Sequence, residues 1–467
     1  MNFSSDNRKN QVKIDAIDVT SDVLTSRGGV SLFYRYVNRL GIFDHLSGCF
    51  APLRERRSGI SPREILKQIM CFFSDGTQPH LTYFDELHMD SGYAASIETH
   101  SSQMASSHQI KRFVGKVSFA RTFTLRKSLQ RLFIESLKAS KPEVIVLGID
   151  TMVMNNDDAD RREGVKPTYK KVKGFQPLQM YWDGRIVDAV FRGGDKHSNH
   201  SDTVEKMIIH MVRRIRKEYR EDVAILIQMD SGFFDQSLFD LCESMHVGYI
   251  CGGKQYKDIV DYISGYGESE WNIYEKSGTE RWEYIGFRDR RASWKRERRA
   301  LYCRYQTEAT GQGVLAFARR DTVIYTNLGV DEVLTEQLRR ADRMDVIEDA
   351  AILKSYHQRA VDELTNRGVK EFCSEHLPFE RFESNMFWYY MMLVSYFVFE
   401  TFKRDVVGSL VTKLAYPNTV RRRVMDIAVK MTRHAGQTIL KVTRGVWEML
   451  DFGTLWRRSG EAIPIAW

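Results

Sequence analysis

The chain has 467 residues, which is too long for a single hydrophobic core of ordinary size, so about two to four structural units are expected. Its 69 Lys and Arg against 61 Asp and Glu leave a net charge of +8, which fits a polyanionic partner without requiring one. The six cysteines are scattered and include no C-x-x-C pair, which predicts free thiols in a cytoplasmic protein. The chain start is polar and the longest apolar run (386–399) has only 14 residues, which argues against secreted and membrane-bound proteins.

The first part of the chain, to about residue 137, has helical patterns. In "SGISPREILKQ", Ser61 as N-cap, Pro62 at the first helical position and Glu64 in capping-box position predict a helix start.

The stretch "MASSHQIKRFVGKVS" predicts a second, short helix that begins at Ser106 or Ser107 and carries Lys111 and Arg112. A helix-turn-helix places such a helix in the major groove of DNA. An amphipathic surface helix is an equally good interpretation of these residues.

From about residue 138 the pattern changes to buried strands. One strand stops at Asp150, a hairpin turns at Asp183-Gly184, and another strand stops at Asp230. The complete order of strand, strand, strand, helix, strand, helix, strand predicts an α/β layer with a mixed sheet.

Residues 255–325 read as short strands rich in Gly, Trp, Tyr and Arg. Two helices follow, of which "DAAILKSYHQRAVDELTNR" is expected to be one continuous helix that stops at Gly368. The apolar run at 386–399 predicts a buried core helix, and the last 65 residues or so are predicted to be basic and helical. On the continuous helix, Tyr356, Arg359 and Glu363 fall within roughly 60° of each other.

Two buried strands that each end on an aspartate form a candidate site, because open α/β sheets build their sites at strand ends. For Asp150 or Asp230 alone, a helix-cap or turn-forming role is an equally good interpretation. Together with Glu363 they make three clustered carboxylates, which repel one another unless cations neutralise them. A pair of Mg²⁺ ions about 4 Å apart suits carboxylate oxygens and in-line phosphoryl transfer on a phosphodiester.

These residues also carry a family resemblance. Tyr356, Arg359, Glu363 and Lys370 fill the signature Y-x₂-R-x₃-E-x₆-K, Asp150 ("LGID") and Asp230 ("QMDSG") precede it in order, and "YTNL" lies at 325–328. Over about residues 140–400 the chain resembles the bacterial insertion-sequence DDE transposases, which have an RNase H-like catalytic core.

The resemblance implies an α/β fold: an RNase H-like mixed sheet flanked by helices, interrupted by a β-rich insertion, with helical N-terminal and C-terminal regions. The expected units are a DNA-binding region at 1–137, a catalytic domain at 138–254 and 326–402, the insertion at 255–325, and a basic helical region at 403–467.

The resemblance also implies roles for the signature residues. Asp150, Asp230 and Glu363 would bind two Mg²⁺ ions, with Mn²⁺ as a substitute. Phosphates near the transposon end would be held by Tyr356, Arg359 and Lys370. A surface ion pair with Glu363 or Asp362 remains the alternative for the two cations, and Lys370 lies beyond the expected helix end.

In related transposases the insertion contacts DNA. Here it interleaves cations with aromatic rings, so backbone contacts and base stacking are both expected. The candidate residues are Arg291, Lys295, Arg298, Trp282 and Trp294. Core packing is an alternative role for both tryptophans.

The resemblance therefore implies a DNA transposase that binds terminal inverted repeats, cleaves double-stranded DNA through a hairpin intermediate and joins it to target DNA as a homodimer. Two rivals stay open. One is an RNase H-like nuclease without strand transfer, and the other is a catalytically inert DNA-binding repressor.

Overall fold

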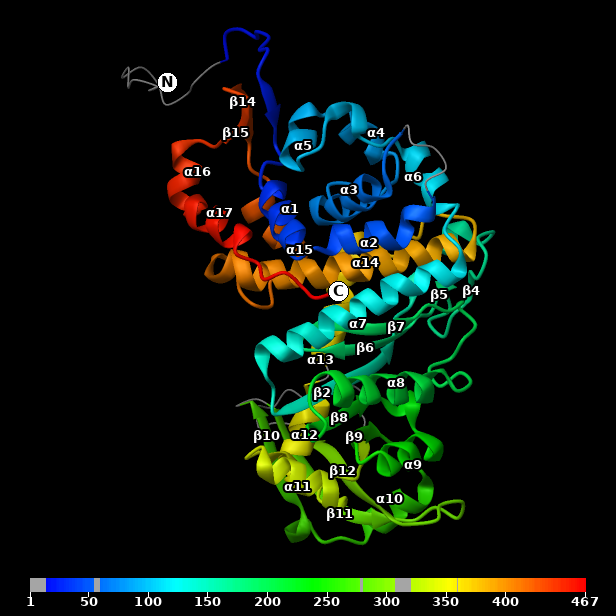
Figure 1. Cartoon of the computed structure of the whole chain (residues 1–467). Coiled ribbons are helices and arrows are strands. Elements are labelled where there is room, and N and C mark those ends of the chain that lie inside the picture. The colour runs from blue at the N-terminus through cyan, green and yellow to red at the C-terminus, as the bar shows by residue number, and fades with distance from the viewer. Residues whose placement is uncertain (1–13, 54–58, 278–279, 307–320, 359) are drawn as a thin grey trace.

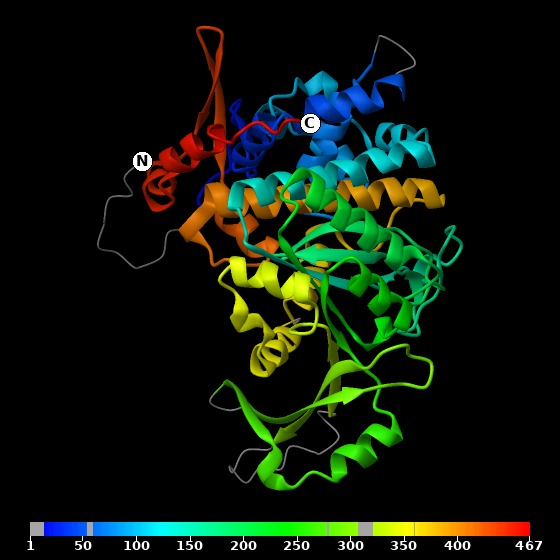
Figure 2. The ribbon, with the colours of Figure 1, turned by 60° about the horizontal axis from the view of Figure 1, so that its bottom comes forward.

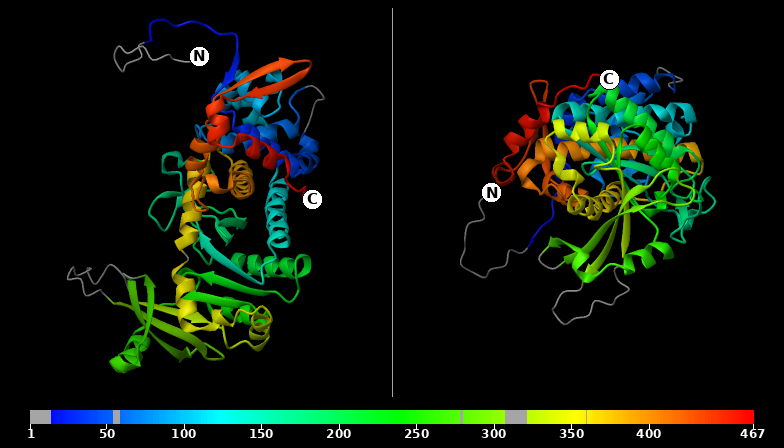
Figure 3. Two further views of the ribbon diagram at one scale, coloured as in Figure 1. Left: turned by 90° about the vertical axis from the view of Figure 1, so that its left-hand side faces the viewer. Right: turned by 90° about the horizontal axis from the view of Figure 1, so that it is seen from below.

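The computed structural model describes residues 14–53, 59–277, 280–306, 321–358 and 360–467. Figure 1 shows three layers of structure along the long axis of the molecule. A helical end lies at the top, the large sheet lies in the middle, and the strands of the 255–325 segment lie at the bottom. The first described residues and the C-terminus both lie at the helical end (Figures 1 and 3).

The N-terminal region is helical, as predicted. Its helices are α1 (Val30–Arg39), α2 (Ile42–Phe50), α3 (Pro62–Asp75), α4 (Tyr83–Met89), α5 (Ser91–Ser96), α6 (Ser107–Val114) and α7 (Phe119–Ser140). The predicted start of α3 is confirmed, because the Ser61 side chain accepts a hydrogen bond from the Glu64 backbone N–H at 3.2 Å. Ser106 caps α6 in a capping box with Gln109.

Nine of the described strands form one mixed sheet in the order β10-β11-β12-β13-β9-β8-β2-β6-β7. These strands are β2 (Val144–Thr151), β6 (Leu178–Trp182), β7 (Arg185–Val190), β8 (Ala224–Met229), β9 (Gly248–Gly252), β10 (Asn272–Ser277), β11 (Glu280–Asp289), β12 (Arg298–Gln306) and β13 (Thr322–Thr326). Only β2, β8 and β9 pair in parallel; the other pairings are antiparallel. The predicted hairpin turn is confirmed at Asp183 and Gly184, whose φ angles are 47° and 73°.

Helices cover both faces of this sheet. They are α8 (Thr203–Glu218), α9 (Gln236–Ser244), α10 (Lys257–Ser264), α11 (Glu332–Arg340), α12 (Asp349–His357), α13 (Ala360–Cys373) and α14 (Phe382–Phe402). One buried cluster joins Ile145, Leu147 and Ile149 of β2 to the apolar sides of α7 and α8. A second cluster, on the opposite face, joins Leu226 and Ile250 to α11 and α12. Figure 3 shows α12 and α13 on one side of the sheet and α7 and α8 on the other.

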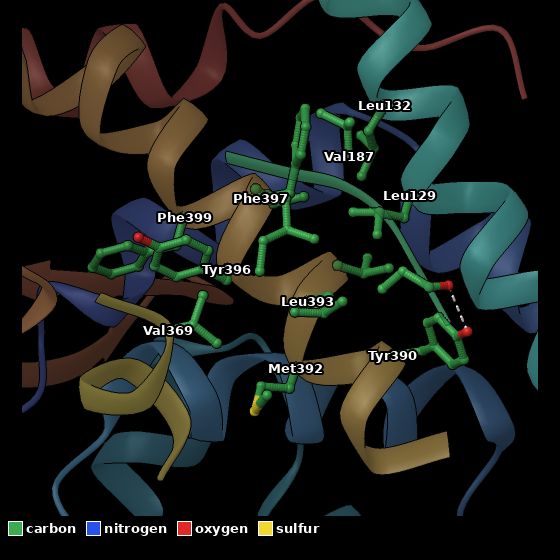
Figure 4. Packing of buried hydrophobic residues seen from close by; sticks show 14 of the residues in the cluster. Leu129, Leu132, Val187, Val369, Tyr390, Met392, Leu393, Tyr396, Phe397 and Phe399 are labelled. Atoms are coloured by element: carbon green, nitrogen blue, oxygen red, sulfur yellow. Dashed lines mark hydrogen bonds between the residues drawn. The ribbon is translucent and has the colours of Figure 1, made fainter. Parts of the chain in front are cut away.

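The apolar run at 386–399 lies in α14, and its side chains are buried, as predicted. Figure 4 shows Tyr390, Leu393 and Phe397 directed toward Leu129 and Leu132 of α7. The Tyr390 hydroxyl donates to the Ala189 carbonyl of β7 at 2.8 Å. In the described part of the chain, no helix has the length and apolar character to span a bilayer. All six cysteines are free thiols.

The 255–325 segment is rich in strands, as expected. It does not interrupt the large sheet, however, because its strands extend that sheet. β12 pairs with β11 on one side and with β13 on the other, and β13 pairs with β9. The large sheet therefore runs without interruption from β2, β8 and β9 into the segment (Figure 2).

The prediction of a wholly helical C-terminal region is wrong. Besides α15 (Pro417–Val420), α16 (Arg444–Met449) and α17 (Phe452–Gly460), it contains a hairpin of β14 (Val429–His434) and β15 (Gln437–Lys441). The hairpin turns at Ala435 and Gly436, which have positive φ, and β14 pairs with β1 (Val23–Thr25) near the chain start. Alternating apolar residues around an Ala-Gly pair carried this strand signal in the sequence.

Candidate active site

The two strand-end aspartates lie side by side. β2 and β8 are adjacent and parallel, and Ile149 is in register with Met229. Asp150 and Asp230, the next residues along the two strands, therefore reach the same edge of the sheet, both half-buried. Asp150 accepts a hydrogen bond from the Thr151 backbone N–H at 2.6 Å, and Asp230 accepts one from the Gly232 N–H at 2.8 Å.

Glu363 reaches this edge from α13, where it is exposed. One turn further along α13, Oδ1 of Asn366 lies 2.6 Å from the hydroxyl oxygen of Tyr181. The same hydroxyl contacts the amide of Gln179, and Gln179 pairs directly with Asp150 across β2 and β6. This partly buried polar contact thus attaches the helix that carries Glu363 to β6, the neighbour of the strand that carries Asp150.

Tyr169 is a site residue that the sequence interpretation missed. It lies in the turn between β4 (Lys166–Pro167) and β5 (Lys173–Phe175), which form a small sheet with β3 (Met154–Asn155). Its side chain is 62% exposed. Partial burial raises the pKa of the Tyr169 hydroxyl, and the charges of Asp150, Asp230 and Glu363 raise it further. All three predicted carboxylates are therefore near enough to influence one hydroxyl group electrostatically.

The turn that carries Tyr169 is well braced. The Thr168 hydroxyl and backbone N–H both contact the Val172 carbonyl, at 2.8 and 2.9 Å, and Lys171 has a φ of 61°. Lys170 lies over the Tyr169 ring with its Nζ 5.8 Å from the centroid. The sequence signal was the run "TYKKVK", a tyrosine among cations at the beginning of the predicted hairpin.

The three carboxylates suit a hard divalent cation by their chemistry, since such ions prefer carboxylate oxygens. Two of them, Asp150 and Asp230, are held at one edge of the sheet by adjacent strands with little positional freedom. Among the described residues, no three His, Cys, Asp or Glu side chains lie close enough together to hold a metal ion as they stand. Asp150 and Asp230 accept hydrogen bonds from backbone N–H groups, whereas Glu363, exposed on its helix, is the least constrained of the three carboxylates.

The expected continuous helix from 349 to 367 is wrong. α12 ends at His357 and α13 begins at Ala360, so Tyr356 and Glu363 lie on different helices. Arg359 lies outside the described residues. The Tyr356 hydroxyl occupies the space where a side chain on Gly252 would begin, next to the Ser231 N–H of the Asp230 turn. Tyr356 is therefore close to the carboxylates in spite of the break.

The expected helix end at Gly368 is also wrong, because α13 continues to Cys373. The missing Cβ of Gly368 leaves room for the Tyr396 hydroxyl, which lies 2.5 Å from the position of such a Cβ. Lys370 is thus helical and lies seven residues after Glu363, on the same side of α13. Its Nζ pairs with Glu375 at 2.6 Å, in place of the expected Glu363 or Asp362.

Both tryptophans of the 255–325 segment are buried. Trp294 is 6% exposed and packs against Phe239 and Tyr325, while Trp282 is 7% exposed and lies 4.5 Å from the ring of His357 in α12. These rings are core residues in this conformation, which agrees with the alternative interpretation.

The cations of the same segment divide into two kinds. Arg298 is buried and pairs with Asp240 at 2.5 Å and Glu243 at 2.9 Å, so its guanidinium is held by protein carboxylates. Arg291 is partly exposed and pairs with Asp289 at 2.9 Å, whereas Lys295 is exposed. At the other end of the molecule, Lys111 and Arg112 are exposed on α6.

Comparison with known proteins gives a family. The sequence matches the family model for the transposase DDE domain, group 1, over residues 7–452, and no curated protein matches it. Among solved structures it is similar to a cryo-EM structure of a piggyBac transposase synaptic complex with hairpin DNA, with 11% identity and a TM-score of 0.39, over 86% of this chain and 80% of that one. Because the family model spans nearly the whole chain, this protein belongs to the DDE transposases of domain group 1.

Proposed function

We propose that this protein is a DNA transposase of the bacterial insertion-sequence type, with an RNase H-like catalytic domain that cleaves and joins DNA. The observation that carries the proposal is that Asp150 and Asp230 lie side by side at the carboxyl edge of β2 and β8, with Glu363 in electrostatic reach of the same hydroxyl, that of Tyr169. Two carboxylates on rigid strand ends and a third on a neighbouring helix are suited to phosphodiester chemistry with hard cations.

The three carboxylates would hold two Mg²⁺ ions, or Mn²⁺ in their place. When bound, the metals would activate a water or 3′-hydroxyl and stabilise the leaving oxygen. Asp150 and Asp230 are held by backbone N–H groups and fix one side of the site. Glu363 completes it from α13.

Neighbouring side chains would position the DNA. The Tyr169 hydroxyl is protonated at neutral pH, since its pKa lies above the already high value of an ordinary tyrosine, so it can donate to a phosphate oxygen. Tyr356, Arg359 and Lys370 are assigned to phosphates near the transposon end, and Lys370 would exchange Glu375 for this contact. More distant backbone contacts are assigned to Arg291, Lys295, Lys111 and Arg112.

The reaction would begin with binding of terminal inverted repeats and hydrolytic nicking. The freed 3′-hydroxyl would then attack the opposite strand to give a hairpin, since the same site can serve both steps. Opening of the hairpin and attack on target DNA would follow. Holding two ends together requires two such sites, so the synaptic complex is proposed to be a homodimer.

The test uses purified full-length protein, Mg²⁺ and a labelled duplex that carries the element's end, with products separated on a denaturing gel. Asp150→Asn, Asp230→Asn and Glu363→Gln should each abolish cleavage and leave DNA binding largely intact. Asp158→Asn, an exposed carboxylate nearby, is the matched control and should cleave normally.

Each result has a clear reading. Full cleavage by any of the three variants would contradict the proposed site. Nicks without hairpin or joined products would favour the nuclease alternative, and binding without cleavage by the wild type would favour the inert repressor.

A further inference from the structure

The outer surface of α8 carries a stripe of basic residues. Lys206, His210, Arg213 and Lys217 are all exposed and follow one another at intervals of four, three and four residues. This spacing keeps them within roughly 60° around the helix axis and spreads them over about 16 Å of its length. They therefore form one continuous line along the helix.

The stripe borders a groove. The opposite side of α8 is buried in the core through Met207, Ile208 and Met211. α7 lies alongside, joined by a hydrogen bond of 2.8 Å from Arg214 to Gln130 and by an ion pair of 3.2 Å from Arg131 to Glu218. Between the helices is a hollow of about 560 Å³, termed here the α7–α8 groove. It is lined by Lys127, Gln130, Lys206, Ile209, His210, Arg213, Arg214, Lys217 and Glu218.

The charge of the groove is strongly one-sided. Its lining has five Lys and Arg side chains against the single carboxylate of Glu218. That carboxylate is already engaged by Arg214 at 2.7 Å and by Arg131. Desolvation lowers the pKa of His210, which leaves its ring neutral at pH 7. The net charge of about +4 in one groove equals half of the excess of the whole chain.

The exposed cations are largely without protein partners. None of the described ion pairs includes Lys127, Arg213 or Lys217, and Lys206 has only an exposed pair with Asp202 at 2.7 Å. An ordinary solvated helix surface balances its charges, as α11 does where Arg340 pairs with Glu336 at 3.2 Å. A line of unbalanced cations beside a hollow instead fits a polyanion.

The groove is distinct from the candidate active site but leads toward it. It lies on the sheet face opposite to that of α12, as the two buried clusters show. The loop before α8 reaches the end of β8, where Asn199 donates to Asp235 at 3.0 Å. Lys206 thus lies at the end of the stripe nearer to the strand ends, and Lys217 lies at the far end.

We propose that the α7–α8 groove binds the sugar–phosphate backbone of duplex DNA as it passes away from the active site. The charge of the groove indicates a polyanion, and that this polyanion is DNA rests on the proposed function. Lysine and arginine at this spacing contact phosphates without reading bases, so the groove adds affinity that is independent of sequence.

The main test measures binding of a labelled random-sequence duplex by full-length protein without Mg²⁺, by fluorescence anisotropy over a series of salt concentrations. The double variant Arg213→Ala/Lys217→Ala should bind roughly tenfold or more weakly near 0.1 M salt. The slope of log K against log salt should fall by about 1.8, since each lost phosphate contact removes about 0.9. Arg339→Ala/Arg340→Ala on α11 removes the same charge and should change neither quantity.

A second measurement uses the unmodified protein. An amine-reactive reagent followed by mass spectrometry should show Lys127, Lys206 and Lys217 protected when duplex is added. Unchanged reactivity of these lysines, or equal losses of affinity in the two double variants, would overturn the proposal. Because both readouts are binding in the absence of metal, they stand apart from the cleavage results for Glu363→Gln, and either proposal can fail alone.

Discussion

At the scale of single residues, the hydroxyl of Tyr181 links the sheet to the helix that carries Glu363. It is buried, contacts Gln179 beside Asp150, and lies 2.6 Å from Oδ1 of Asn366 in α13. A glutamate on a helix is placed only as accurately as the helix itself, and small displacements of reacting groups carry large kinetic penalties.

Removing this hydroxyl should therefore affect the reaction more than the stability. Tyr181→Phe is expected to lower the single-turnover cleavage rate about 10- to 100-fold. The free energy of unfolding should fall by only about 0.5–1.5 kcal/mol. Tyr390→Phe, which removes a hydroxyl that bonds to β7 instead of α13, is the matched control. Equal cleavage rates in the two variants would contradict a positioning role for Tyr181.

The raised pKa of Tyr169 gives a pH prediction. Its hydroxyl is protonated below its folded-state pKa, which lies above the ordinary tyrosine value, so its donor is present throughout the neutral range. Tyr169→Phe should reduce cleavage about fivefold, the value of one lost hydrogen bond. The ratio of wild-type to variant rates, measured between about pH 7 and 9, should stay constant. A ratio that falls across this range would show that the hydroxyl ionises there.

At the scale of elements, the site shows how far the sequence could predict. Strand ends at Asp150 and Asp230 were predictable because buried β-branched runs stop there and parallel strands bring them to one edge. The break between α12 and α13 was not predictable from the sequence. The residues of the signature keep helical spacing across it, and no Gly or Pro stands at the break. At Gly368 the sequence predicted a helix end where the helix continues. A glycine that makes room for a neighbouring side chain, here Tyr396, cannot be told from a helix-ending glycine by sequence.

The attachment of α7 to the sheet depends on a buried carboxylate. Asp188 of β7 is fully buried and accepts two hydrogen bonds from Arg126, at 2.6 and 2.7 Å, and one from Gln130 at 2.8 Å. Asp188→Ala should lower the free energy of unfolding by about 3–5 kcal/mol, because it leaves a buried guanidinium unpaired. Urea denaturation would measure this, and Asp345→Ala, whose ion-pair partner Arg343 is exposed, should cost at most about 1 kcal/mol.

At the scale of the whole molecule, distant parts of the chain meet at Arg421. This buried arginine donates to the carbonyls of Phe73 and Ser74 at the end of α3 and of Phe372 in α13, at 2.7, 3.0 and 2.7 Å. The N-terminal helices, the helix of Glu363 and the C-terminal region are thereby fastened together. The expected sequence boundaries at 137 and 403 therefore do not separate free-standing parts.

Loss of this arginine should destabilise the whole molecule. Arg421→Ala leaves several buried carbonyls without a donor, at about 1–3 kcal/mol each, so the thermal unfolding midpoint should drop by many degrees. The exposed neighbour Arg422 supplies the control, and Arg422→Ala should unfold close to the wild type. Similar midpoints for the two variants would show that the carbonyls find other donors.

The pairing of β12 with β13 has a consequence for anyone who wants a minimal catalytic core. Residues 255–321 are not an independent unit that can be deleted. Without them β13 would lose its pairing with β12, and its N–H and C=O groups on that side would be unpaired. Such an edge recruits strands from other molecules, so the shortened protein should aggregate. A smaller engineered transposase would have to keep these strands, or cap β13 with a new one.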